Sequence, residues 1–374
     1  MKVYFDNAAT TPIDSAVLEE MMPFLTDHFG NPSSIHSFGR KTRAAIEKAR
    51  KQVAQVINAA PGEIFFTSCG TESNNTIIRN AVRDMGVQRI ISSEIEHHCV
   101  LHALEREEKG DTEIQFVRID RLGVVDFDHL QELLRGSQKK TMVSLMHANN
   151  EIGTLLDLQR VADLCAQHQA IFHTDTVQSL GFYPIDVQKT KIHFLTGSAH
   201  KFHGPKGIGF FYMSPESHIG ALLEGGAQER NMRAGTENIY GIVGLGKALS
   251  LAAAARESTQ QHITQLRQHM ITLLKRDIPG IAFNSFEDDR CHYKVLSVSL
   301  PPSEKSDLVI FNLDIAGVAA SGGSACSSGS EVGSHVLKGI GADAKRKAVR
   351  FSFSRHNTIE EVEYAVKILK ESIQ

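Results

Sequence analysis

Residues 141–175 read TMVSLMHANNEIGTLLDLQRVADLCAQHQAIFHTD. This stretch holds an apolar run at 141–147, an amphipathic segment at 158–168 and a second apolar run at 170–175. Strands buried on both faces of a parallel sheet are continuous apolar runs, and an amphipathic helix can make the crossover between them. The stretch therefore predicts a strand, a helix and a second strand parallel to the first.

The same alternation extends on both sides, from about residue 60 to residue 215. The apolar runs lie at 63–68, 88–93, 114–119, 141–147, 170–175, 193–198 and 207–213. Helical patterns lie between them at 71–85, 97–109, 126–135 and 158–168. Because strands that alternate with helices form α/β folds, we expect a large domain with a doubly wound, mostly parallel seven-stranded sheet.

Beyond Asn238 the pattern changes to that of a smaller α+β unit. Its elements are helical segments at 239–256 and 260–276, strand-like runs at 294–300 and 348–354, and helices that start at Ser306 and Thr358. We expect the N-terminal segment to join this unit. The predicted large domain spans residues 12–255, and the predicted small domain spans residues 1–11 and 256–374.

The composition excludes several classes of protein. The chain has 374 residues, with 40 Lys plus Arg, 43 Asp plus Glu and a formal net charge of −3, so we expect no direct binding of nucleic acid. No stretch reaches the roughly 18 apolar residues that span a bilayer. The start, MKVYFD, lacks the apolar core of a signal peptide. We therefore expect a soluble, cytoplasmic protein that does not bind membranes.

The cysteines also favour a reducing compartment. Cys69, Cys99, Cys165, Cys291 and Cys326 are an odd number and contain no CxxC pair, which argues against a zinc knuckle and against a disulfide framework. We expect no bound metal. The first four lie in apolar or helical surroundings and are interpreted as ordinary buried thiols.

Polar residues follow several predicted strands, at the edge of the sheet where α/β proteins bind ligands. A glycine-bearing turn at 68–72 enters a helix, whose free N–H groups favour a phosphate, although Thr71 could be a plain helix N-cap. Asp175 ends an apolar strand, where it needs a cationic or N–H partner or caps the next turn. Lys201 follows another strand and could form a Schiff base or simply lie at the surface. An aspartate, a lysine and a phosphate cup together indicate pyridoxal phosphate.

Seven motifs resemble those of the cysteine desulfurases, which are pyridoxal-phosphate enzymes of the class V aminotransferase group. They are 4–12 (YFDNAATTP), 29–34 (FGNPSS), 66–74 (FTSCGTESN), 147–153 (HANNEIG), 198–207 (SAHKFHGPKG), 233–238 (RAGTEN) and 323–330 (GSACSSGS). The resemblance runs from about residue 4 to residue 370 and is similar to the NifS/IscS branch. It implies fold type I, the aspartate aminotransferase-like fold. Asn231 stands where members of this family often have glycine.

The resemblance assigns cofactor roles to matching residues. Lys201 would hold the cofactor as a Schiff base, and Asp175 would pair with the pyridine nitrogen. Gln178 would hydrogen-bond the phenolic oxygen, while His97 would stack on the ring and move protons, although beside His98 it could be merely exposed. The phosphate would be held by Gly70, Thr71, Ser198 and His200. Thr236 would reach the phosphate of a second subunit, which implies a homodimer.

Two residues are implied as ligands of the substrate carboxylate. Asn150 follows an apolar strand, where it could also be only a turn residue. Arg350 has the planar fork that suits a carboxylate, although on a half-exposed strand it could face solvent. Arg355 is the alternative cation, and we favour Arg350.

Cys326 lies in a segment, 319–330 (AASGGSACSSGS), in which no side chain is larger than cysteine. Such a segment cannot anchor itself in a core, and we expect it to be mobile, either as a linker with an incidental thiol or as a carrier of a nucleophile. The resemblance favours the nucleophile.

The resemblance thus implies a transferase that converts L-cysteine to L-alanine and carries the sulfur as a persulfide on Cys326. The resemblance implies a sulfur-acceptor protein as partner, either an iron–sulfur scaffold or a tRNA-thiolation enzyme. A selenocysteine lyase or another class V enzyme, such as a small-amino-acid aminotransferase, is the nearest alternative. A sulfur carrier with a vestigial cofactor site is the alternative from another class, and the presence of Lys201, Asp175 and His97 argues against it.

Overall fold

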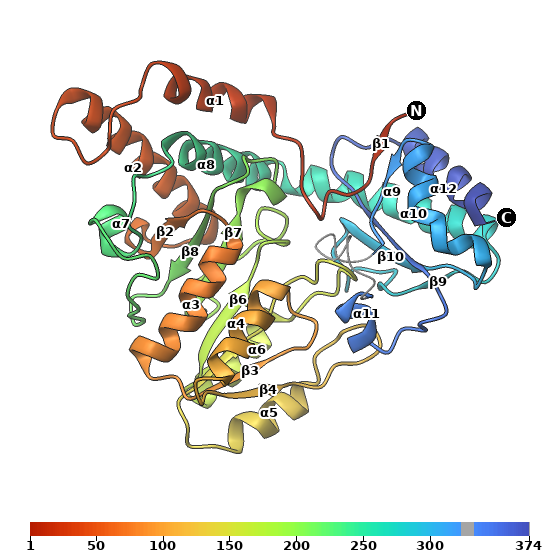
Figure 1. The fold of residues 1–374 in the computed structure, drawn as a ribbon, viewed down its shortest axis with the longest axis horizontal. Coiled ribbons are helices and arrows are strands. Elements are labelled where there is room, and N and C mark those ends of the chain that lie inside the picture. The colour runs from red at the N-terminus through yellow and green to blue at the C-terminus, as the bar shows by residue number, and fades with distance from the viewer. Residues whose placement is uncertain (323–332, 374) are drawn as a thin grey trace.

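The computed structural model describes residues 1–322 and 333–373 (Figure 1). Its largest sheet has seven strands in the order β2-β8-β7-β6-β5-β3-β4. The strands are β2 (Ile64–Thr67), β3 (Arg89–Ser92), β4 (Glu113–Phe116), β5 (Thr141–Ser144), β6 (Ile171–Asp175), β7 (Phe194–Ser198) and β8 (Gly209–Met213). Only β8 runs antiparallel to its neighbours, since the short connection from β7 has no room for a crossover helix. The prediction of a mostly parallel seven-stranded sheet is confirmed.

Helices cover both faces of this sheet, because successive strand residues point to opposite sides. On one face Ile90, Phe194 and Phe211 pack with α3 and α4, and on the other Ile91 and Leu195 pack with the remaining helices. Figure 1 shows the two helical layers on either side of the strands. The helices are α1 (Ser15–Thr26), α2 (Ser37–Ile57), α3 (Gly70–Met85), α4 (His98–Glu108), α5 (Phe127–Arg135), α6 (Leu158–Gln167) and α8 (Ile239–Ala254).

Helix α8 is apolar on nearly all sides because it lies between other helices. A Cβ atom added at Gly246 would come within 2.9 Å of the Ala49 Cα atom of α2, so glycine permits the close approach of the two helices. α8 meets α9 (Arg256–Asp277) at an angle of 71°. Among the described residues, no single helix is long and apolar enough to cross a membrane, although this bent pair passes by length and composition alone.

The smaller part of the molecule is built on an antiparallel sheet of order β12-β10-β9, and both chain ends lie there (Figure 1). The N-terminal segment contacts it, because β1 pairs with β11 and Asp6 pairs with Ser352. The other elements are β1 (Val3–Tyr4), β9 (Ala282–Phe283), β10 (Val295–Ser299), β11 (Val318–Ala319), β12 (Ala348–Ser352), α10 (Val309–Ile315), α11 (His335–Gly339) and α12 (Ile359–Ile373). The domain limits at 11/12 and 255/256 stay a prediction.

A strained segment lies against the edge strand β2. Glu229, Arg230 and Asn231 all have left-handed backbone angles, with φ of 42°, 58° and 67°. The Glu229 carboxylate accepts two hydrogen bonds from Arg50, at 2.8 and 2.9 Å, and one from the Phe66 N–H at 3.0 Å. These buried contacts hold the strained backbone in place. Asparagine is among the few non-glycine residues that tolerate this region, which accounts for Asn231 where glycine is common in the similar family.

Candidate active site

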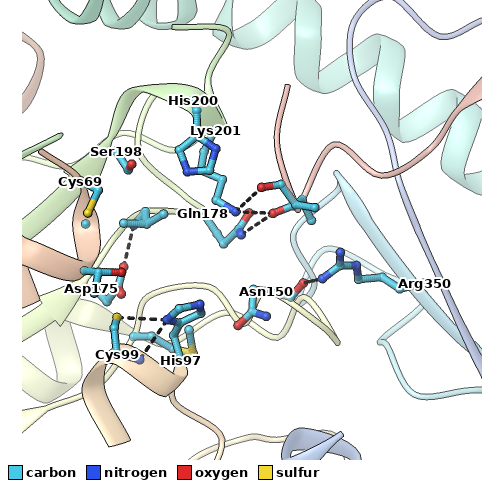
Figure 2. Close-up of a pocket in the computed structure, with 16 residues that line it drawn as sticks. Cys69, His97, Cys99, Asn150, Asp175, Gln178, Ser198, His200, Lys201 and Arg350 are labelled. Atoms are coloured by element: carbon cyan, nitrogen blue, oxygen red, sulfur yellow. Dashed lines mark hydrogen bonds between the residues drawn. The ribbon is translucent and has the colours of Figure 1, made fainter. Parts of the chain in front are cut away.

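A cavity of about 250 Å³ opens at the carboxyl ends of the parallel strands, beside the smaller sheet (Figure 2). Ten of the twelve residues that the sequence singled out for the site line it. Its lining is Ala8, Ala9, Cys69, Gly70, Thr71, His97, Cys99, Met146, Asn150, Asp175, Val177, Gln178, Ser198, His200, Lys201 and Arg350. Residues up to about 340 positions apart in the chain therefore meet here, as expected for the end of an α/β sheet.

Lys201 extends into this cavity from the turn after β7. Its Nζ donates hydrogen bonds to the carbonyl oxygens of Ala8 at 2.6 Å and Ala9 at 2.8 Å. The N-terminal segment thus reaches across to the amine and orients it. His200 lies beside it, with Nδ1 3.2 Å from Thr10 Oγ1, and burial followed by the charge of Lys201 lowers the pKa of His200 to about 3. His200 is therefore a neutral hydrogen-bonding group at physiological pH.

Asp175 is buried at the end of β6 and aims its carboxylate at the same cavity. Asn74 Nδ2 donates to its Oδ2 at 2.7 Å, and the Val177 N–H donates to its Oδ1 at 2.9 Å. A buried carboxylate needs hydrogen-bond donors, and Asn74 and Val177 supply them. A Cβ atom at Gly70 would come within 2.7 Å of Val177 Cγ2, so glycine is required where α3 approaches this turn.

The start of α3 forms a cup for an anion. The helix begins at Gly70 without a side-chain cap from Cys69, which leaves its first N–H groups directed at the cavity. Ser198 Oγ is buried nearby and has no hydrogen-bond partner among the described residues. An unpaired hydroxyl and unpaired helix N–H groups fit a phosphate at this point.

His97 is the N-cap of α4. Its Nδ1 accepts a hydrogen bond from the Cys99 backbone N–H at 3.2 Å and lies 3.0 Å from Cys99 Sγ. Burial lowers the pKa of His97, and the positive charge of Lys201 adds to this, while Asp175 acts in the opposite direction. The ring is therefore held neutral, with Nδ1 as acceptor and the proton on Nε2.

Arg350 and Asn150 occupy the side of the cavity nearest the small sheet (Figure 2). Arg350 donates to the Asn150 carbonyl oxygen and to Asp6 Oδ1, each at 2.8 Å, while its Nε has no partner among the described residues. Arg355 instead pairs with Asp14 and does not line the cavity. The geometry thus favours Arg350 over Arg355 as the cation for a carboxylate.

Gln178 lies beside Lys201, since both side chains donate to the Ala8 carbonyl oxygen (Figure 2). Its Nε2 donates to the Ala8 carbonyl oxygen at 3.0 Å, and its Oε1 is buried without a partner in the described part of the chain. With Ser198 Oγ, Asn150 Oδ1 and Arg350 Nε, this gives four buried polar atoms around the cavity that have no partner among the described residues. Ser198 Oγ, the Lys201 amine and the Asp175 carboxylate fit the phosphate, the aldehyde and the pyridine nitrogen of pyridoxal phosphate, respectively.

Two predicted residues are not placed in the cavity. Thr236 is exposed and lines a separate hollow of about 200 Å³ with Ser68 and Arg233. It does not cap α8, because Asn238 is the N-cap of that helix. Cys326 lies outside the described residues. No group of three or more His, Cys, Asp or Glu in residues 1–322 and 333–373 has an arrangement that could hold a metal ion.

The interpretation of all four remaining cysteines as ordinary buried thiols is wrong for two of them. Cys165 and Cys291 are buried, but Cys69 and Cys99 are partly exposed and line the cavity. Apolar neighbours in the sequence suggested that both thiols are buried. Both residues lie where a strand or loop leads into a helix, and this position brings them to the cavity. Cys99 lies two positions after the predicted site residue His97, and this spacing could have identified it as a cavity residue.

A buried amine behind the cavity predicts a pH dependence of stability. Lys294 is 1% exposed and donates to the Lys201 carbonyl oxygen at 2.9 Å. Burial and then the charges of Lys201 and Arg350 lower its pKa well below the usual value, against an opposing effect of Asp6. The unfolded chain binds this proton up to about pH 10.4, so it holds more protons than the native state and stability rises with pH in that window.

We expect Lys294→Met to remove that contribution. The free energy of unfolding, measured by denaturant titration at a series of pH values, should rise less steeply, by up to about 1.4 kcal/mol per pH unit below pH 10.4. The exposed Lys51→Met is the control and should leave the slope unchanged. Equal slopes for Lys294→Met and the unmodified protein would contradict the assignment.

Comparison with known proteins gives one consistent family. The model of the aminotransferase class-V family matches residues 3–365. A cysteine desulfurase IscS from Dictyoglomus turgidum is 41% identical over 378 aligned positions, covering 100% of this chain and 95% of that protein. A putative cysteine desulfurase IscS 1 from Bacillus subtilis is 42% identical, covering 98% and 97%.

Solved structures show the same similarity. A NifS-like protein superimposes with a TM-score of 0.92 at 35% identity and covers 99% of both chains. A NifS-like protein from Rickettsia africae superimposes with a TM-score of 0.89 at 29% identity, covering 100% of this chain and 99% of the other.

Proposed function

The chain belongs to the aminotransferase class-V family, and from that membership we propose how the residues of its cavity carry out the reaction of a cysteine desulfurase. The protein is a pyridoxal-phosphate-dependent enzyme of that kind, with L-cysteine as substrate. The observation that carries the assignment of residues is that the Lys201 amine, the Asp175 carboxylate and the anion cup at Gly70 line one cavity.

We propose the following cofactor contacts within this cavity. Lys201 would hold the aldehyde, Asp175 would face the pyridine nitrogen, and Gln178 would donate to the phenolic oxygen. The phosphate would lie at the start of α3, against Gly70, Thr71, Ser198 and His200. Pyridoxal phosphate, when bound, takes up the electron pair that remains on the substrate Cα after its proton leaves.

Proton movement falls to Lys201 and His97. Lys201 is half-buried in the cavity, and its amine would act as the general base toward the Cα proton. His97 would stack on the cofactor ring, and its Nε2–H would pass a proton into the cavity as another proton reaches Nδ1, so that the ring stays neutral. Arg350 and Asn150 would hold the substrate carboxylate, the former with its planar fork.

Sulfur transfer is assigned to Cys326 from the sequence. Its thiolate would attack the substrate Sγ, forming an S–S bond while the Cβ–Sγ bond breaks. The electron pair of the broken bond stays on the three-carbon fragment, which takes up protons and leaves as L-alanine. The sulfur then remains on Cys326 as a persulfide for transfer to an acceptor.

A homodimer is part of the proposal. Exposed apolar side chains gather on α1 and on the segment that enters α2, and exposed patches of this kind mark interfaces. They are Leu18, Met22, Leu25, Phe29, Ile35 and Phe38. α1 packs against α8, which begins at Ile239, three residues after Thr236, and we propose that a partner bound on this surface reaches Thr236.

Thr236→Ala should therefore weaken cofactor binding by about tenfold, because a hydrogen bond to a charged phosphate is lost. In a dimer mixed from Thr236→Ala and Lys201→Ala chains, the site with an intact Lys201 receives its Thr236 from the other chain. Cofactor affinity at that site should recover. Absence of recovery, or a monomer on sedimentation, would contradict a cross-subunit role.

The proposal also includes a sulfur-acceptor protein and a cellular compartment. We assign the sulfur to an acceptor protein, either an iron–sulfur scaffold or a tRNA-thiolation enzyme, and we place the enzyme in the cytoplasm. The four described cysteines are all free, as suits a reducing compartment.

Substrate tests separate this function from its nearest alternatives. The purified protein given L-cysteine should produce alanine, and given L-alanine with an oxo acid it should transfer no amino group. Release of selenium from selenocysteine with none of sulfur from cysteine would assign a selenocysteine lyase instead. Amino transfer without loss of sulfur would assign an aminotransferase.

A further inference from the structure

One buried asparagine joins two of the groups that face the cofactor cavity. Asn74, in α3, is fully buried. Its Nδ2 donates to Asp175 Oδ2 at 2.7 Å and to Cys99 Sγ at 3.2 Å, while its Oδ1 lies 3.2 Å from His173 Nε2. A carboxylate can only accept, so the amide nitrogen must face Asp175.

His173 fixes the amide in that orientation. Burial lowers the pKa of His173 to about 3, so the ring is neutral. Its Nε2 must then carry the proton that Asn74 Oδ1 accepts, and its Nδ1 accepts from Ser144 Oγ at 2.9 Å. Every polar atom of the Asn74 side chain thus has a complementary partner, and the carboxylate of Asp175 cannot turn away without breaking one of them.

Asn74 has two branches of contacts, one directly to Asp175 and a second through Cys99 to His97. Cys99 Sγ accepts from Asn74 Nδ2. The same sulfur lies 3.0 Å from His97 Nδ1 (Figure 2). Burial, with a smaller effect from Asp175, raises the pKa of the Cys99 thiol to about 12, so it keeps its proton. The thiol can therefore donate to His97 Nδ1, as the Cys99 backbone N–H does. Both donors favour the tautomer of His97 that carries its proton on Nε2.

We propose that Asn74 is a positioning residue that holds Asp175 directly and His97 through the Cys99 sulfur, so that the two groups face the cofactor as one unit. This inference rests on the proposed function, since it concerns the same cavity. It predicts that the two branches can be cut separately. Cys99→Ala should affect only the His97 branch, Cys99→Ser should preserve it, and Asn74→Ala should cut both.

The test is a double-mutant cycle on binding of pyridoxal phosphate to the apoprotein, read as the dissociation constant and the absorption maximum of the bound cofactor. Asn74→Ala should weaken binding by about tenfold or more and shift the absorption maximum. In an Asp175→Ala background most of this loss should disappear. Likewise, the smaller loss from Cys99→Ala should disappear in a His97→Gln background.

Asn80→Ala is the matched control, because Asn80 is also a buried asparagine of α3 but donates to the Gly220 carbonyl oxygen, outside the cavity. It should lower the melting temperature without changing the dissociation constant or the spectrum. Additive effects in the Asp175 cycle, or an equal loss of binding in Asn80→Ala, would overturn the inference. Failure of the unmodified apoprotein to bind pyridoxal phosphate would instead overturn the proposed function.

Discussion

Lys201→Ala is expected to abolish turnover of L-cysteine, with a loss of about four orders of magnitude or more. The substitution removes both the amine that would hold the cofactor and the base that would take the Cα proton. It should also remove the cofactor linkage that borohydride reduces to a stable bond. Turnover and reductive labelling, followed by peptide mapping, measure the two effects.

Lys206→Ala is the matched control for this change. Lys206 lies five positions further along the chain, is exposed and does not line the cavity. Its replacement should leave both the linkage and the turnover close to those of the unmodified protein. A reductive label recovered on Lys206 would overturn the assignment of Lys201.

Cys326→Ser should lose the protein-bound persulfide entirely while cofactor binding is kept. A serine hydroxyl stays protonated at neutral pH and is a far poorer nucleophile toward sulfur than a thiolate. Trapping of the persulfide with an alkylating reagent and mass spectrometry measures its loss. The loss is specific to the group that attacks the substrate sulfur.

Cys69→Ser is the control within the same protein, because Cys69 lines the cavity but starts a helix at the phosphate cup. It should still accumulate the persulfide. Sulfide release by Cys326→Ser at the rate of the unmodified protein, without added thiol, would show that the mechanism is wrong.

The sheet was predictable from the sequence because its strands are buried on both faces. Runs such as 170–175 have no polar alternation, and their ends agree with β6 (Ile171–Asp175) to within one residue. Helices α1 and α2 were not predicted. The prediction rested on the alternation of strands with helices, which begins near residue 60, after both of these helices. The α2 signal was present in the apolar spacing of Ile46, Val53 and Ile57.

The cavity was predictable to the extent that its residues follow strands. Asp175 and Lys201 stand directly after apolar runs, where α/β sheets bind ligands. The carbonyl oxygens of Ala8 and Ala9, which accept from Lys201, carry no side-chain signal and lie more than 190 residues away. Asn74 was missed for a different reason, since a polar residue within an amphipathic helix looks like part of its solvent face until the packing of α3 on the sheet is known.

A single turnover with L-cysteine shows whether the substrate sulfur passes to Cys326. The purified holoenzyme is mixed with about one equivalent of L-cysteine per subunit, without reductant, and both alanine and the site of the bound sulfur are determined. We expect alanine in equal amount to a persulfide on Cys326, and neither product from Lys201→Ala. Alanine formed with free sulfide and no persulfide, or a persulfide on another cysteine, would contradict it.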